Sequence, residues 1–206
     1  MYRNYREQKM ASSKLKIVMF LGTVREGRLG PRVTKFIQAQ LQSKYDITLF
    51  DPQEIDLPLM KKPLHFYKDR SQAPEMLVNC EKKLKEADAF ILVTAEYNHS
   101  VPPALSNLLD HFGSSLYSYK PSGIVCYSPG PYGGMRAAMQ LRCLLSELGT
   151  LSVSNIFGIP EIMKAIDEDG KPLNDRMVSG LNRMMTQLDW HAHSMKNHRD
   201  QFGLPQ

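Results

Sequence analysis

The chain has 206 residues, of which 42% are hydrophobic and 23% charged, a balance typical of one globular domain with a sizeable core. This composition excludes a disordered or fibrous protein, and no apolar run approaches the roughly 18 residues of a membrane-spanning helix. The net charge of +5 invites a nucleic-acid or anionic-membrane partner, but its position argues against one. Residues 1–16 hold five basic side chains and one acidic one, whereas the rest of the chain holds 21 basic and 20 acidic side chains. The body is nearly neutral, so we expect neither nucleic acid nor a membrane as its partner.

The basic segment 1–15 is expected to be a disordered tail. It lacks the apolar core of a secretory signal, which indicates that the protein is not exported. Two alternatives stay open, because an acid-poor, Arg-containing segment also resembles an organellar transit peptide and because Met10 could be a translation start. Three scattered cysteines, Cys80, Cys126 and Cys143, have no metal-ligand spacing and suggest no disulfide framework. We therefore predict reduced thiols and a cytoplasmic location.

Short apolar runs alternate with helical patterns along the body. Strands are predicted at residues 16–21, 46–50, 89–94, 123–127 and 151–157. Amphipathic helices are predicted where apolar residues recur at helical spacing, over residues 33–41, 76–84, 105–112, 137–148 and 177–188. This alternation predicts an α/β fold, a doubly wound sheet of five parallel strands with helices on both faces. We expect a single domain over residues 16–196, followed by a C-terminal tail over residues 197–206.

The longest irregular stretch, residues 52–73, is unusually long for a connection in a compact domain. Its apolar residues indicate that it packs against another part of the molecule: Leu57, Leu59, Met60, Leu64, Phe66 and Tyr67. Two interpretations stay open. The segment either covers a site or an interface, or it closes over the protein's own core.

The loop after the first predicted strand, residues 22–31, indicates an anion site. Ligands of open α/β sheets bind beyond the carboxyl ends of the strands, and in the order 2-1-3-4-5 the loops after strands one, three and four meet there. This loop combines glycines with the hydroxyl of Thr23 and the guanidinium groups of Arg25 and Arg28, just before a helix. It lacks a triphosphate-binding Lys-Ser or Lys-Thr pair, a cysteine and a GxGxxG pattern, which favours a monophosphate-bearing ligand. A helix-opening turn with exposed arginines is the alternative.

The loops after the third and fourth predicted strands carry groups suited to a flat heterocycle. Tyr97 could pack against a ring, and Asn98 could hydrogen-bond to its edge. In residues 128–136, paired glycines would let backbone N–H groups approach a ligand. Taken alone, each loop could also be an ordinary turn, and His99 could be an ordinary surface histidine.

Together, the three loops resemble those of the NAD(P)H-dependent FMN reductases, a flavodoxin-like family that includes quinone reductases and azoreductases. The resemblance spans about residues 16–195 and is carried by Gly22-Thr23-Val24-Arg25, by Glu96-Tyr97-Asn98 with Pro102, Pro103, Ala104, Leu105, Asn107 and Asp110, and by Gly130, Gly133 and Gly134 with Ala137, Gln140, Leu141 and Leu148. It implies a flavodoxin-like fold of strand order 2-1-3-4-5, bound FMN, and NADPH or NADH as co-substrate. It also implies a homodimer, with residues 52–73 and the helix after Pro102 as interface elements.

The resemblance further implies roles for individual residues. Thr23, Arg25 and Arg28 would hold the FMN phosphate, and Glu96, Tyr97 and Asn98 would border the isoalloxazine ring. The loop that contains Ser128, Tyr132, Gly133 and Gly134 would meet the pyrimidine side of that ring. Ala95 stands where the family frequently has proline, and Ser106 where it frequently has lysine, which affects the expected substrate more than the expected flavin.

The reaction implied by the resemblance is a ping-pong transfer of hydride from the nicotinamide through flavin N5 to a quinone, an azo compound or free flavin. No protein acid or base is obligatory, and His99 and Tyr97 are the nearest candidates for proton delivery. No metal site is expected, because the C-terminal histidines lack an acidic or cysteine partner at ligand spacing: His191, His193 and His198. The rival interpretation is a non-catalytic, FMN-binding electron carrier or redox-dependent interaction protein. The nearly neutral body argues against it, because a carrier usually needs an acidic docking face.

Overall fold

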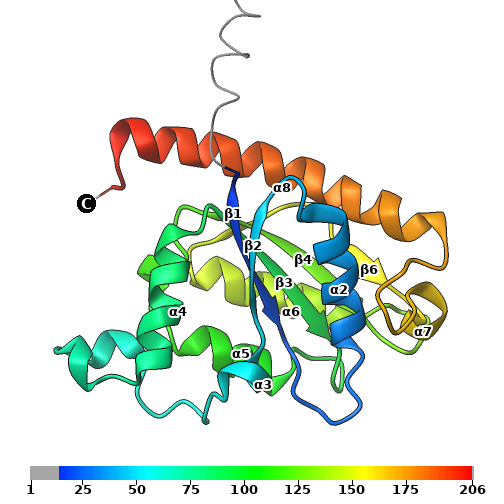
Figure 1. The fold of residues 1–206 in the computed structure, drawn as a ribbon, viewed down its shortest axis with the longest axis horizontal. Coiled ribbons are helices and arrows are strands. Elements are labelled where there is room, and N and C mark those ends of the chain that lie inside the picture. Colours follow the sequence, from blue (N-terminus) through cyan, green and yellow to red (C-terminus); the bar gives the residue numbers. More distant parts are fainter. Residues whose placement is uncertain (1–13, 206) are drawn as a thin grey trace, which may run out of the picture.

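The computed structural model describes residues 14–205 and shows alternating strands and helices (Figure 1). The strands are β1 (Lys16–Leu21), β2 (Asp46–Phe50), β3 (Ala89–Ala95), β4 (Pro121–Tyr127), β5 (Leu151–Ser152) and β6 (Phe157–Ile159). The helices are α2 (Gly30–Leu41), α3 (Pro52–Ile55), α4 (Glu75–Glu86), α5 (Pro103–Asp110), α6 (Met135–Glu147), α7 (Ile162–Ala165) and α8 (Asp175–Phe202), with short 3-10 turns η2 (Leu64–Phe66), η3 (Arg70–Gln72) and η4 (Ser114–Leu116). The predicted disordered tail, apart from its last two residues, and the start at Met10 lie outside the described residues.

The strands form one parallel sheet in the order β2-β1-β3-β4-β5, which confirms the predicted flavodoxin-like topology. The prediction of one fifth strand over 151–157 was wrong, because this segment splits into β5 and β6. Both pieces pair with β4, β5 at its start and β6 at its end. Between them the backbone leaves the ladder: the N–H of Asn155 donates to the side chain of Gln187 in α8 at 2.8 Å instead of to a strand.

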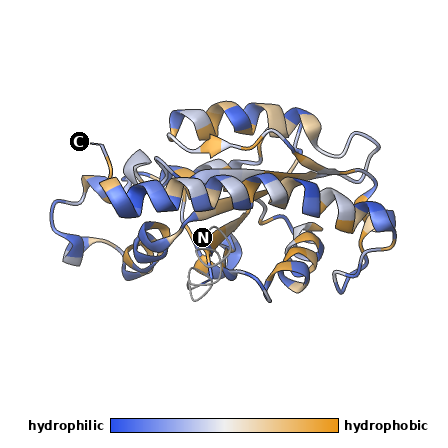
Figure 2. Ribbon diagram, turned by 90° about the horizontal axis from the view of Figure 1, so that it is seen from above, coloured by the Kyte–Doolittle hydropathy of each residue, from blue (hydrophilic) through white to orange (hydrophobic). Residues whose placement is uncertain are grey.

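Helices cover both faces of the sheet, and each face has its own apolar core (Figure 2). Side chains alternate along β1 as the pleat requires, so that Met19 faces one core and Phe20 the other. The first core lies between the sheet and helices α2 and α8, and the second lies between the sheet and helices α4, α5 and α6. Both strands and helices therefore have the apolar faces that the sequence pattern predicts.

Helix α8 runs to Phe202, beyond the tail boundary expected at residue 197. Its last turns are held to the amino end of the sheet by Asp88, which is 4% exposed. The Asp88 carboxylate accepts hydrogen bonds from the backbone N–H of Lys16 at 3.0 Å, from Lys196 at 2.9 Å and from Arg199 at 3.5 Å. Within residues 14–205, no helix is both long enough and apolar enough to cross a membrane.

A second buried charge, Lys120, lies at the same end of the sheet and is 7% exposed. Its ammonium donates to the backbone carbonyls of Leu84 at 2.6 Å and Lys85 at 3.1 Å, in the last turn of α4. Burial lowers the pKa of Lys120 to about 8, and the positive charge of Arg199 acts in the same direction. Lys120 thus stabilises the end of a helix at the cost of its own hydration.

The segment 52–73 folds into α3, η2 and η3 and packs against the core. Leu64 is 1% exposed, and the side chain of Asn107 in α5 accepts from the N–H of Met60 at 2.7 Å and donates to the carbonyl of Pro58 at 2.9 Å. These contacts support the interpretation that the segment closes over the protein's own core. Phe66 remains 63% exposed.

Candidate functional site

The loops after β1, β3 and β4 meet around a cavity of about 210 Å³ at the carboxyl end of the sheet. Its lining comes from all three loops and from the ends of β3 and β4: Thr23, Arg25, Gly27, Arg28, Leu29, Ala95, Glu96, Tyr97, Tyr127 and Pro129. This is the position that the strand order predicts for a ligand, because the order reverses between β1 and β3.

Tyr97 joins the first and second loops. Its hydroxyl shares a hydrogen bond of 2.5 Å with the hydroxyl of Thr23, which is 1% exposed. The guanidinium carbon of Arg25 lies 3.7 Å from the centroid of the Tyr97 ring, a cation–π contact. Arg25 forms no ion pair with a carboxylate in the described part of the chain. The loop therefore presents a cation without an acidic partner and a buried hydroxyl on one side of the cavity.

Arg28 differs from Arg25 because its charge is paired. Its two terminal nitrogens donate to the two carboxylate oxygens of Asp51, each at 2.6 Å, and one of them also donates to the carbonyl of Thr23 at 2.6 Å. The two side chains are 11% and 10% exposed. Asp51 also accepts from the N–H of Gln53 and so caps α3. Asp51 was missed by the sequence reasoning, although an aspartate before a proline at a strand end is a typical helix-cap signal.

Glu96 follows β3 and lines the cavity, and its side chain contacts the first turn of α6. Its carboxylate accepts from the backbone N–H groups of Arg136 at 3.0 Å and Ala137 at 3.3 Å, and from the Arg136 guanidinium at 2.6 and 2.7 Å. Burial alone would raise the pKa of Glu96, but these hydrogen bonds and the charge of Arg136 hold it below its usual value. Because Gly134 at the start of α6 has no side chain to cap the helix, Glu96 supplies the cap from another loop.

Residues 97–100 form a tight turn next to the cavity. Tyr97 and Ser100 exchange backbone hydrogen bonds of 3.1 and 2.9 Å, and the two residues between them have positive φ, 51° at Asn98 and 63° at His99. The side chain of Gln140 in α6 donates to the carbonyl of His99 at 3.0 Å and accepts from the hydroxyl of Ser100 at 2.7 Å. Asn98 and His99 are exposed at the tip of this turn and do not line the cavity.

The third loop borders the cavity through Pro129, whereas the predicted residues Ser128, Tyr132, Gly133 and Gly134 lie outside its lining. Gly134 requires the absence of a side chain, because its φ is 78° and a Cβ would lie 2.9 Å from backbone atoms of Tyr127. The hydroxyl of Ser128 donates to the carbonyl of Gly130 at 3.0 Å. Tyr132 is 66% exposed and lies under the Arg136 guanidinium.

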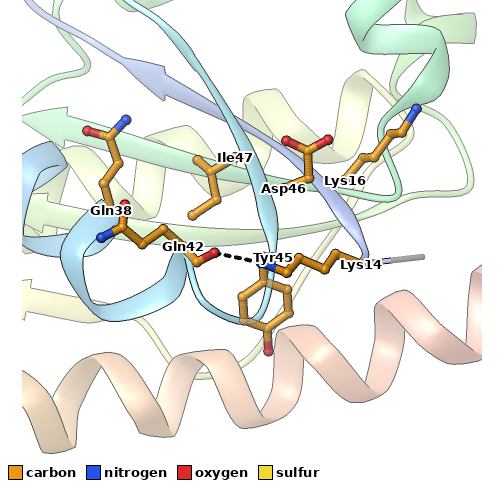
Figure 3. A pocket seen from close by; sticks show the side chains of 7 residues that line it. All are labelled: Lys14, Lys16, Gln38, Gln42, Tyr45, Asp46 and Ile47. Atoms are coloured by element: carbon orange, nitrogen blue, oxygen red, sulfur yellow. Dashed lines mark hydrogen bonds between the residues drawn. The ribbon is translucent and has the colours of Figure 1, made fainter. Parts of the chain in front are cut away.

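A larger hollow, of about 670 Å³, lies at the opposite end of the sheet (Figure 3). It is lined by Lys14, Lys16, Gln38, Gln42, Tyr45, Asp46 and Ile47. Three of its polar side chains already have partners: the ammonium of Lys14 donates to the carbonyl of Gln42, Lys16 pairs with Glu86, and the hydroxyl of Tyr45 donates to Asp189. We therefore place the candidate site at the smaller cavity.

The C-terminal histidines are spread along the surface of α8. Within residues 14–205, no three side chains of the histidine, cysteine, aspartate or glutamate type come together as a metal site.

The residues around the smaller cavity fit FMN. A phosphate needs cationic and neutral hydrogen-bond donors, and Arg25 and Thr23 supply both. Gly27, with a φ of 66°, has no atom within 4 Å of the position that a Cβ would occupy, so the backbone is open to a ligand there. The cavity is smaller than the roughly 300–1,000 Å³ of typical ligand pockets, so it can enclose only part of FMN, with the rest over the surrounding loops.

Comparison with known proteins identifies the family of the chain. The family model described as NADPH-dependent FMN reductase matches residues 15–164. An NADPH azoreductase of Bacillus sp. (strain OY1-2) is 26% identical over 84% of this chain and 93% of its own length. A quinone reductase of Escherichia coli (strain K12) is 27% identical over 75% of this chain and 80% of its own length.

The fold is also similar to that of a solved structure. The flavoenzyme NAD(P)H:(acceptor) oxidoreductase FerB from Paracoccus denitrificans aligns with a TM-score of 0.69 at 23% identity, over 90% of this chain and 99% of that one. The chain belongs to the NADPH-dependent FMN reductase family and is an oxidoreductase that uses FMN and a reduced nicotinamide nucleotide.

Proposed function

We propose that this protein reduces quinones, azo compounds or free flavin with NADPH or NADH, in a ping-pong reaction. The observation that carries the proposal is the cavity shared by Thr23, Arg25, Glu96 and Tyr97 at the carboxyl end of the sheet. When bound, FMN would supply the redox chemistry by taking up hydride at N5 and passing it to the acceptor. The names of the relatives, azoreductase and quinone reductase, support small-molecule acceptors.

The protein's own residues would bind and orient the cofactor. Arg25 would leave the ring of Tyr97 or tilt on it to reach the phosphate, and the hydroxyl of Thr23 would add a neutral donor. Arg28 would hold the loop in place, because its N–H donors already bind Asp51 and the carbonyl of Thr23. The paired charge makes Arg28 a weaker phosphate ligand than Arg25.

The other two loops would border the ring system. Tyr97, Asn98 and the backbone of Glu96 would contact one edge, and the loop of Ser128, Tyr132, Gly133 and Gly134 would contact the pyrimidine side. His99 is the better candidate for proton delivery, since it is exposed on the adjoining turn. The hydroxyl of Tyr97 is already hydrogen-bonded to Thr23.

The electron-carrier alternative predicts the same flavin site without turnover. The names of the relatives favour the reductase. A homodimer, with an interface at residues 52–73 and α5, and a cytoplasmic location belong to the proposal as well. Exposure of Leu59 and Phe66 in that segment supports the interface.

An anaerobic titration followed by visible spectroscopy tests the proposal. The purified protein should show a flavin spectrum after FMN is supplied, NADPH or NADH should bleach it, and a quinone should restore it. Bleaching by neither nucleotide would favour the carrier. A protein that binds no FMN would contradict both interpretations.

A further inference from the structure

Glu96 is a charged residue that lies between the candidate flavin site and the start of α6. Glu96 is one of the residues that line the cavity, and its side chain is 6% exposed. Its carboxylate accepts hydrogen bonds from two backbone N–H groups of α6 and from the guanidinium of Arg136. The positive end of the helix dipole is therefore occupied by a residue of the protein and does not face a ligand directly.

The two charged side chains of this ion pair differ in their exposure to solvent. Arg136 is 43% exposed, so water screens its charge, whereas the Glu96 carboxylate is almost fully buried. A buried charge acts over a longer range than a hydrated one. The pair should therefore make the electrostatic potential in the cavity more negative, because Arg136 offsets only part of the Glu96 charge.

We propose that Glu96 and Arg136 together set the redox potential of FMN in this site, with Glu96 disfavouring the reduced cofactor and Arg136 offsetting it. The inference rests on the proposed function, since it needs FMN in the cavity. Reduction adds negative charge to the flavin, and a nearby carboxylate opposes that addition. The charged side chains of both residues act on the cofactor through space, whereas the ring contact proposed for Glu96 involves only its backbone.

The main test is the midpoint potential of FMN bound to the Glu96→Gln variant, measured anaerobically against a reference dye. Glutamine has the same shape and can still accept from the N–H groups of Arg136 and Ala137, so the cap of α6 is retained while its charge is lost. The potential should become more positive. Relative to the wild type, the variant should bind reduced FMN roughly tenfold better in comparison with oxidised FMN, because one negative charge is removed from a partly buried site.

Arg136→Gln should shift the potential in the opposite direction, because it leaves the Glu96 charge without its cation. The double variant should return toward the wild-type value, a rescue that mere loosening of the loop would not produce. Glu147→Gln, an exposed acidic residue at the far end of the same helix, is the matched control and should leave the potential unchanged.

The outcomes separate this inference from the proposed function. If the wild type binds FMN and Glu96→Gln has the same or a more negative potential, the inference is overturned while the reductase proposal stands. If the two single variants shift the potential in the same direction, electrostatic tuning is also overturned. If the wild type binds no FMN, the proposed function fails and the inference fails with it.

Discussion

The two ends of the sheet use buried charges in different ways. At the amino end, Asp88 and Lys120 are surrounded by groups that fix helices to the sheet, and each contact ends on a backbone atom or an opposite charge. At the carboxyl end, Glu96 is paired in a similar way, but Arg25 lies on an aromatic ring without a carboxylate. The buried charges of the first end fix helices to the sheet, whereas the second end keeps a cation without an acidic partner, which we propose binds the FMN phosphate.

The largest expected effect tests the amino end. Asp88→Ala removes the acceptor shared by Lys196 and Arg199 and should lower the free energy of unfolding by about 3 kcal/mol, measured by chemical denaturation. Asp200→Ala is the control, because Asp200 is 64% exposed and lies 3.9 Å from Lys196. Equal losses in the two variants would contradict the anchoring role of Asp88.

The next effect depends on pH and on Lys120. Burial lowers the pKa of Lys120 to about 8 in the folded protein, whereas the unfolded chain keeps the ordinary value of 10.5. Between these values the unfolded state binds the extra proton, so stability rises with pH. From pH 7 to pH 10 the free energy of unfolding of the wild type should rise by about 2 kcal/mol relative to that of Lys120→Met. Chemical denaturation at both pH values measures this change. If the stability difference between the wild type and Lys120→Met is the same at both pH values, burial does not lower the pKa of Lys120 as assigned.

At the carboxyl end, Arg25→Ala tests the unpaired cation. Loss of charge-assisted contacts should weaken FMN binding by roughly tenfold or more and riboflavin binding much less, measured by fluorescence titration. Arg183→Ala, an exposed arginine on α8, should leave both affinities unchanged. Equal weakening of the two flavins by Arg25→Ala would remove the phosphate role from this loop.

The smallest effect concerns the turn over residues 97–100. Gln140→Ala removes two hydrogen bonds to this turn and should cost about 1 kcal/mol of stability. The loss should be concentrated in faster hydrogen exchange of the Ser100 amide, which bonds to Tyr97. Unchanged exchange at Ser100 would show that the turn holds its left-handed conformation without α6.

The sequence predicts the parts of this molecule that depend on local patterns. The apolar runs of β1 and β3 and the glycine- and arginine-rich loop after β1 are visible without coordinates. The pairing of Arg28 with Asp51 and of Glu96 with α6 is not, because these residues are 23 and 40 positions apart and meet only when the loops converge. The contacts of Asp88 with the last turns of α8, beyond residue 195, are distant in sequence in the same way.

The interruption between β5 and β6 has a consequence for how copies of this protein behave next to one another. A long, regular outer strand would offer a row of free N–H and C=O groups to a strand of another chain, which is a common start of aggregation. Here the outer row is divided into segments of two and three residues, and Gln187 takes up the N–H of Asn155 at the gap. This side of the sheet is therefore a poor template for intermolecular strand addition, so the protein can be concentrated without extending its sheet there.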